Sequence, residues 1–252
     1  MRKSNLNRSV LLFCLLFSAG TTAFAQEKKE EKLAVTVSLN HDAFFGFNPM
    51  LSASYPVAKK TDLTFYGIQW GAGTASAWGN WTEFGLGLNF KTGKFAINPQ
   101  LGFTMGSLLS SGASQRGVIG DGIVPNLTVN YDDSKFLGQF YSGYYAALRN
   151  ETVEAGEDAT NNYMHYWINA GVKATPWLAI GAHFENLYLA GGKINGGGSL
   201  DRLEGYQWFG PFVQVSKGAA GMRFSFGADL TDKTTPSFSS SDFYKLSFFI
   251  NL

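Results

Sequence analysis

The chain has 252 residues, of which 45% are hydrophobic, 15% aromatic and only 15% charged. Soluble domains usually carry about 25% charged residues, so this composition indicates little surface charge. Three of the 20 basic residues lie in a predicted N-terminal signal. The rest of the chain has 17 basic and 19 acidic residues, and its net charge of −2 argues against a nucleic-acid partner. The single cysteine, Cys14, lies in that signal, so we expect neither disulfides nor a cysteine-type metal site.

The N-terminus has the pattern of a secretory signal. Basic residues precede an apolar run at 10–17, and small residues follow it. We predict a cleaved signal peptide over residues 1–25 and a charged periplasmic tether over residues 26–32. The run is too short to cross a bilayer, and no later stretch reaches about 18 apolar residues, which excludes a helical membrane anchor. Phe13 stands before Cys14 where a lipoprotein site requires a small residue, so we expect no lipid anchor.

Turn signals divide residues 33–252 into segments of about ten residues, the length of a tilted strand that crosses a bilayer. The first strand is expected at 33–43 and the second at 50–57, with a bend at 47–49. Short polar or glycine-bearing connections follow at 58–62, 91–94, 132–135, 175–177 and 217–220. Longer linkers fall at about 71–80, 106–121, 150–161, 190–204 and 231–241. This alternation predicts an all-β fold: a closed antiparallel transmembrane β-barrel of about twelve strands, with short periplasmic turns and longer extracellular loops.

Apolar residues occupy alternate positions along these segments. The clearest rows begin at Leu33, Phe84, Phe95, Met164 and Met222, and their neighbours are mainly small or polar. We predict that the apolar rows face lipid and that the barrel closes, because unpaired backbone amides are costly in hydrocarbon. A soluble lipocalin-like carrier with the apolar rows inside is the minor alternative. It would carry charge on its outer face and close with about eight strands.

The last segment forms an unbroken apolar row of Tyr244, Leu246, Phe248, Ile250 and Leu252. This row resembles the C-terminal signal of Gram-negative outer-membrane proteins, although that signal usually ends in an aromatic residue. The resemblance implies that the barrel-insertion machinery reads the C-terminal strand. Outer-membrane lipid and this machinery are therefore the expected partners. The expected location is the bacterial outer membrane, reached through the periplasm.

Two features oppose this scheme. Pro99, Pro125 and Pro211 fall within predicted strands, where each removes a donor from the ladder, and the pattern gives no reason for them. Apolar residues also occupy both faces of three segments, at 63–70, 136–149 and 205–216. Because their faces are ambiguous, ten and fourteen strands stay open as alternative counts.

Most of the mature chain is similar to an uncharacterised family of Gram-negative outer-membrane β-barrels. The stretches that carry this resemblance are WTEFG (81–85), NPQLG (98–102), IVPNLTVN (123–130), QFYSGYY (139–145) and HYWINAG (165–171). The resemblance implies the barrel fold and offers no assigned activity, so function has to be argued from the lumen.

The polar residues on the opposite faces predict what lines that lumen. They are Glu83, Gln100, Asn126, Asn130, His165, Asn169, Lys173, His183, Glu185, Arg223, Asp229 and Lys245. Both signs of charge occur, without the single-sign field of a strongly ion-selective pore. Twelve strands also lie between the filled eight-stranded barrel and the open porin. We therefore expect either a plug of paired charges or a narrow passive pore for small neutral or zwitterionic solutes.

Two histidines raise the question of catalysis, because some twelve-stranded outer-membrane barrels are hydrolases. The turn near Pro176 predicts a register in which His183 faces Asn169 and Glu185 faces Trp167. This register places His165 several residues from His183, so metal binding by both would need further ligands. No Walker loop, CxxC pair or HExxH motif is present, and no Ser–His pair is evident. We expect no catalytic residues, no metal and no cofactor.

Three functions remain open: a narrow passive pore, which leads, a non-conducting barrel that is structural or displays its loops, and an outer-membrane hydrolase. The longest linker, 106–121, contains Leu108, Leu109, Val118 and Ile119. Because an exposed apolar loop promotes aggregation, we expect this linker to fold back into the barrel mouth.

Overall fold

The computed structural model describes residues 32–71, 81–106, 119–150, 154–232 and 242–252. These residues form strands β1 (Ala34–Asp42), β2 (Gly46–Ala58), β3 (Thr61–Trp70), β4 (Trp81–Thr92), β5 (Phe95–Met105), β6 (Ile119–Asp132), β7 (Phe136–Ala147), β8 (Asp158–Thr175), β9 (Leu178–Ile194), β10 (Ser199–Leu200), β11 (Leu203–Lys217), β12 (Ala220–Asp229) and β13 (Asp242–Asn251). No helix within these ranges is long and apolar enough to cross a membrane.

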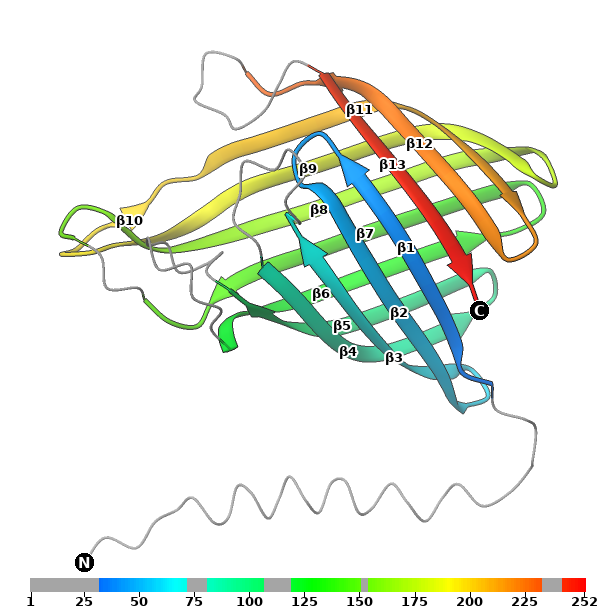
Figure 1. The fold of residues 1–252 in the computed structure, drawn as a ribbon, viewed down its shortest axis with the longest axis horizontal. Coiled ribbons are helices and arrows are strands. Elements are labelled where there is room, and N and C mark those ends of the chain that lie inside the picture. The colour runs from blue at the N-terminus through cyan, green and yellow to red at the C-terminus, as the bar shows by residue number, and fades with distance from the viewer. Residues whose placement is uncertain (1–31, 72–80, 107–118, 151–153, 233–241) are drawn as a thin grey trace, which may run out of the picture. The chain divides into compact units, whose positions relative to one another are not determined.

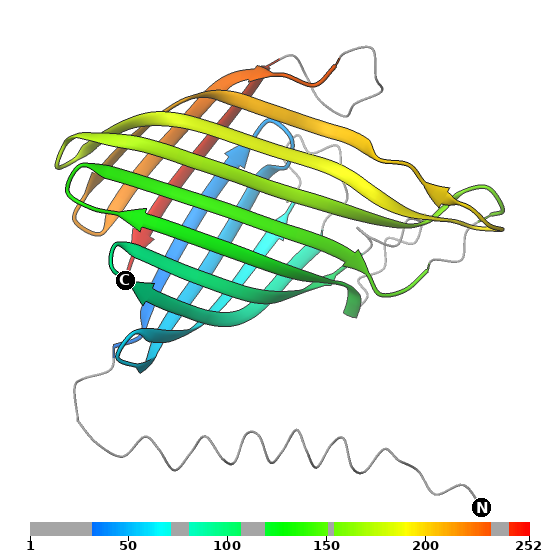
Figure 2. The same ribbon diagram turned by 180° about the vertical axis from the view of Figure 1, so that it is seen from behind.

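Twelve of the strands close into one antiparallel barrel, as predicted (Figures 1 and 2). Each strand from β1 to β9 pairs with the next, β9 pairs with β11, and β11 to β13 follow in order. The last strand returns to the first, with Ile250 opposite Val37. The two-residue strand β10 pairs only with the end of β9 and stays outside the ring.

The apolar rows lie on the outside of the barrel. Leu86 is 57% exposed, whereas Glu83 on the opposite face of β4 is 1% exposed. Phe224, Phe248 and Ile250 are likewise exposed, as the alternation predicts. An apolar exterior around a polar interior is the arrangement of a transmembrane barrel, so the soluble-carrier interpretation is wrong.

Both chain ends of the barrel lie at the same rim as the short turns, here called the short-turn end, and the opposite rim is the long-loop end. The turn between β6 and β7 shows how the short turns are built. Asp133 accepts hydrogen bonds from the hydroxyl of Tyr131 at 2.6 Å and from the backbone N–H groups of Lys135 and Phe136 at 2.7 Å each. These donors lower the pKa of the Asp133 carboxyl to about 2, the Tyr131 hydroxyl contributing most.

The first bend differs from the sequence prediction, which placed it at 47–49. The chain turns at 43–45 instead, and Asn48 and Pro49 belong to β2. The cause is Asp42, whose carboxylate accepts the backbone N–H groups of Phe44 and Phe45 at 3.0 and 2.6 Å. Gly46 follows with a φ of 66°, a value that suits glycine, and starts the return strand.

The hairpin of β8 and β9 is longer than predicted. The linkers expected at 150–161 and 190–204 partly belong to these strands, which pair from Asp158 opposite Ile194 onward. Together with β11 they project beyond the other strands at the long-loop end (Figures 1 and 2). Outside the hydrocarbon layer a strand needs no apolar face. The outer ends of β8 and β9 are therefore polar, and their sequence cannot be distinguished from that of a loop. The predicted signal peptide and most of the tether and of the linkers 71–80, 106–121 and 231–241 lie outside the described residues.

Pro99, Pro125 and Pro211, the prolines that opposed the sequence prediction, follow one rule. Each is exposed on the outer face and keeps its partner in one neighbouring strand; the pairs are Pro99–Leu127, Leu101–Pro125 and Pro211–Ala182. Toward its other neighbour each proline lies in a gap of the ladder, between β4 and β5, β6 and β7, or β11 and β12. Since a residue in an antiparallel strand points its N–H toward one neighbour only, the missing donor interrupts one ladder and spares the other.

We expect a charge on the outer face to destabilise the barrel according to depth. Phe224→Arg places a guanidinium near the middle of β12 and should reduce the free energy of unfolding by about 2–4 kcal/mol. Thr92→Arg, at the short-turn end of β4, should cost about 0–1 kcal/mol. Urea unfolding in lipid vesicles, followed by tryptophan fluorescence, measures both. Equal costs at the two positions would contradict a lipid belt across β12.

Candidate functional site

The half of the lumen near the long-loop end is filled by aromatic and aliphatic side chains. We call this cluster the aromatic plug; its residues are Phe44, Phe45, Tyr66, Ile68, Trp70, Trp81, Val124, Tyr145, Tyr163, Leu187, Tyr206, Trp208 and Phe243. They come from the first turn and from strands all around the barrel. This explains the segments with apolar residues on both faces, because one face contacts lipid and the other packs in the plug.

Rings stack across the plug. Trp208 lies 3.9 Å from Tyr206 and 5.0 Å from Phe243, measured between ring centroids, with nearly parallel planes. Phe45 reaches inward from the turn, and its ring lies 4.7 Å from Trp70. Of the plug residues, Phe44 and Phe45 alone belong to a turn, whereas the others belong to strands whose backbones are fixed by ladder hydrogen bonds.

Glu185 on β9 is the central charge of the lumen and is completely buried. Its Oε1 accepts hydrogen bonds from His165 Nε2 and from the Tyr206 hydroxyl, both at 2.8 Å. Its Oε2 accepts a hydrogen bond from Lys245 Nζ at 2.7 Å and lies 3.0 Å from His183 Nε2. A buried carboxylate is tolerated only with such partners, and this network links side chains of β8, β9, β11 and β13 inside the barrel.

The sequence predicts the register of these strands correctly, with Glu185 opposite Trp167 and His183 opposite Asn169. As expected, this register separates the two histidines along the barrel, since His165 lies opposite Leu187 and His183 opposite Asn169. The sequence did not predict that both would contact opposite oxygens of the Glu185 carboxylate. Diagonal neighbours on adjacent strands are within reach of long side chains, which a count of directly opposed residues does not show.

Glu83 on β4 is another buried carboxylate of the lumen. It accepts hydrogen bonds from the hydroxyl of Tyr66 and from Trp70 Nε1, the latter at 3.0 Å. Glycines make room for the Tyr66 ring: a Cβ on Gly85 would lie 2.1 Å from it, and a Cβ on Gly102 would lie 2.4 Å from its hydroxyl. Small residues opposite large ones therefore allow the lumen to be filled without spreading the strands.

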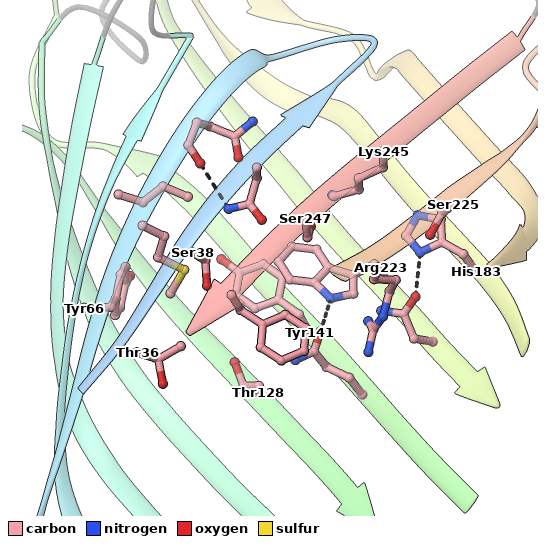
Figure 3. A pocket seen from close by; sticks show the side chains of 18 of the residues that line it. Thr36, Ser38, Tyr66, Thr128, Tyr141, His183, Arg223, Ser225, Lys245 and Ser247 are labelled. Atoms are coloured by element: carbon pink, nitrogen blue, oxygen red, sulfur yellow. Dashed lines mark hydrogen bonds between the residues drawn. The ribbon is translucent and has the colours of Figure 1, made fainter. Parts of the chain in front are cut away.

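The half of the lumen near the short-turn end contains a cavity of about 410 Å³. Figure 3 shows side chains from many strands directed into it, among them His183, Arg223 and Lys245. Amide and hydroxyl side chains make up most of the remaining lining. At its inner end the stacked rings of Tyr141 and Trp167, 3.9 Å apart, lie below the aromatic plug.

Of the twelve predicted lumen residues, Gln100, Asn126 and Asn169 line the cavity, Asn130 accepts a hydrogen bond from Gln139, and Lys173 pairs with Asp132 near a short turn. The other seven fall into three groups. Glu83, His165 and Glu185 lie within or beside the aromatic plug. His183, Arg223 and Lys245 line the cavity. Asp229 lies at the long-loop end of β12, where its carboxylate accepts backbone N–H groups of Gln207 and Thr231 at 3.0 Å each and so has a local structural role.

Sequence reasoning missed the turn residues Asp42, Phe44 and Phe45 as lumen residues, because it placed the bend later in the chain. It also missed Tyr206, since apolar residues occupy both faces of that segment. An Asp followed by aromatic residues and a Gly was the available turn signal. Within the described residues, no group of His, Cys, Asp or Glu has the arrangement of a metal site.

This closed barrel, apolar outside and polar with a filled half inside, defines an outer-membrane type of β-barrel protein. An outer-membrane channel from Pseudomonas putida F1 shares the fold with a TM-score of 0.59 and 12% identity, covering 91% of this chain and 98% of that one. The NanC porin has a TM-score of 0.52 and 9% identity, covering 86% and 100%. At these identities the likeness shows the fold alone.

The chain belongs to a family of unknown function, DUF6733, which matches residues 1–252. This membership confirms the resemblance to an uncharacterised barrel family. No curated protein matches the chain in sequence.

We expect Glu185→Gln to destabilise the barrel strongly, because it leaves Lys245 in the lumen without its counter-charge. Breaking a buried ion pair on one side costs about 3–5 kcal/mol, measured as the free energy of unfolding in urea. The matched control is Glu204→Gln, which removes the charge that pairs with the exposed Arg202 and should cost about 1 kcal/mol or less. Adding Lys245→Met to Glu185→Gln should recover part of the loss, and a further loss would contradict the pairing.

Proposed function

We propose that this protein is a bacterial outer-membrane channel of low conductance for small polar solutes. In this proposal the short turns face the periplasm, the apolar rows contact outer-membrane lipid, and the C-terminal strand is recognised by the barrel-insertion machinery. The observation that carries the proposal is the cavity of about 410 Å³, lined mainly by amide and hydroxyl side chains, at the short-turn half of the lumen. A barrel with a purely mechanical role needs no such space.

The aromatic plug accounts for the low conductance. A solute that enters the cavity from the periplasm meets Tyr141 and Trp167 and then the plug. Among the plug residues, Phe44 and Phe45 are held by the turn and its Asp42 hydrogen bonds rather than by a ladder. Movement of this turn is therefore the least costly way to widen the path, since it leaves all strand pairings in place.

A non-conducting barrel that displays its loops is the second candidate. The filling of the long-loop half favours it, because side chains from all around the wall meet there. The two candidates differ in whether removing part of the plug produces a continuous polar path.

We expect Phe45→Ala to raise single-channel conductance in planar bilayers about twofold or more, because it removes the turn ring that packs on Trp70. Phe224→Ala, which removes a ring on the outer face, is the matched control and should leave conductance unchanged. Since a buried Phe→Ala change costs about 3–5 kcal/mol, folding of each variant is checked by heat-modifiable migration in gels. Absence of conductance in wild type and in folded Phe45→Ala would reject the channel and favour the second candidate.

We propose no catalytic role for the histidines. His165 contacts Glu185 and Tyr206, and His183 contacts Glu185 and Asn169; none of these partners is the serine or cysteine that a nucleophilic site requires. Both rings are also almost completely buried, away from lipid.

The purified protein should accordingly release no fatty acid from phospholipid or lipopolysaccharide. Release by wild type that disappears in folded His165→Gln would contradict this proposal. Equal background release by both proteins would point to a contaminant and agree with it.

A further inference from the structure

The charges around the cavity at the short-turn half are of one sign. Arg223 and Lys245 line it, and none of its lining residues within the described ranges is an Asp or a Glu. The lumen as a whole contains both signs, but its carboxylates lie elsewhere: Glu185 and Glu83 are buried behind the lining. A solute in this cavity therefore meets positive charge and neutral hydrogen-bonding groups.

Arg223 on β12 is the side chain with unused binding capacity. Its Nε and Nη2 donate hydrogen bonds of 2.9 and 2.7 Å to the same atom, Oε1 of Gln214 on β11. Its guanidinium carbon lies 5.0 Å from the centre of the Phe212 ring. No carboxylate within the described residues forms an ion pair with it. A guanidinium has five N–H donors in a planar fork, so a neutral amide satisfies neither its charge nor all its donors.

Lys245 contrasts with Arg223, because its charge is used inside the protein. Its Nζ donates to Glu185 at 2.7 Å and lies 5.2 Å from the centre of the Trp167 ring. The two cations thus have different roles. Lys245 neutralises the buried carboxylate, and Arg223 leaves one positive charge for the cavity.

The neutral lining indicates the rest of the ligand. Gln100, Asn126 and Gln139 supply amides, and Thr36, Thr128 and Ser247 supply hydroxyls. Such groups donate to and accept from hydroxyl groups in any orientation. A volume of about 410 Å³ lies in the range of small-molecule sites.

We propose that this cavity binds a small organic anion with one carboxylate and several hydroxyl groups, and that Arg223 binds the carboxylate. Binding at the site stands on the cavity alone; the claim that this anion is also the permeating solute rests on the proposed channel function. Figure 3 shows Arg223 among the lining side chains that would surround such a ligand.

Isothermal titration calorimetry with the folded barrel in detergent tests the binding, with gluconate as the probe. Glucose lacks the carboxylate and acetate lacks the hydroxyls. Each should bind with an affinity at least about tenfold lower than that of gluconate. No heat with gluconate, or acetate binding as tightly as gluconate, would overturn the proposal.

Substitutions test whether Arg223 is the residue that binds the carboxylate. Arg223→Gln should weaken gluconate binding by about tenfold or more, and Arg223→Lys, which keeps the charge but not the fork, should retain part of it. Gln214→Glu leaves Arg223 in place but gives it an internal carboxylate, and it should weaken binding equally. The matched control Arg202→Gln removes an exposed arginine that pairs with Glu204 away from the cavity and should change nothing. Unchanged affinity in folded Arg223→Gln and Gln214→Glu would overturn the assignment.

The binding site and the channel function are tested by separate measurements, so one proposal can be rejected while the other stands. Gluconate binding in detergent without conductance in bilayers would reject the channel and keep the site. Conductance without gluconate binding would keep the channel and reject the site.

Discussion

The structure depends on one constraint: every backbone N–H and C=O in hydrocarbon has to find a partner within the protein. The chain meets it by pairing β13 with β1, and the backbone N–H of Leu252 donates to the carbonyl of Val35 at 2.8 Å as the ring closes. Closure fixes the number of strands, and with it the circumference and the width of the lumen. Pro99, Pro125 and Pro211 respect the same constraint, since each interrupts one ladder and leaves the other intact.

A barrel of this width must place either side chains or water inside, and this one divides its lumen between the two. Toward the long loops, rings and aliphatic groups pack around Glu185, whose charge is balanced by Lys245 and hydrogen-bonded by His165 and Tyr206. Toward the short turns the same polar faces enclose a cavity lined by Arg223, which bonds to the neutral Gln214 and forms no ion pair with a carboxylate of the described residues. In the proposed channel, the filled half accounts for the low conductance and the open half holds the solute.

Much of the fold is local in origin and could be predicted. Alternation fixed the outward rows, turn residues located five of the short connections, and one turn position gave the register that pairs Trp167 with Glu185. The plug could not be predicted. Alternation assigns apolar residues to the lipid face, so an aromatic residue on the inner face, such as Tyr66 or Trp208, makes the two faces of its strand indistinguishable in the sequence. The first bend was misplaced for a related reason: its position is set by the hydrogen bonds of Asp42, which hydrophobic periodicity does not reveal.

The face of each strand that meets the membrane decides whether the polar side chains line a lumen. Cys14 is the only cysteine of the sequence and lies in the predicted signal, so single cysteines along β4 can carry spin labels without interference. In lipid vesicles, labels at positions 84, 86 and 88 should be accessible to oxygen and shielded from a water-soluble nickel complex. A label at position 89, on the inner face of β4, should not share that oxygen accessibility. The reverse alternation, or none, would contradict an apolar face in lipid and a polar face around the lumen.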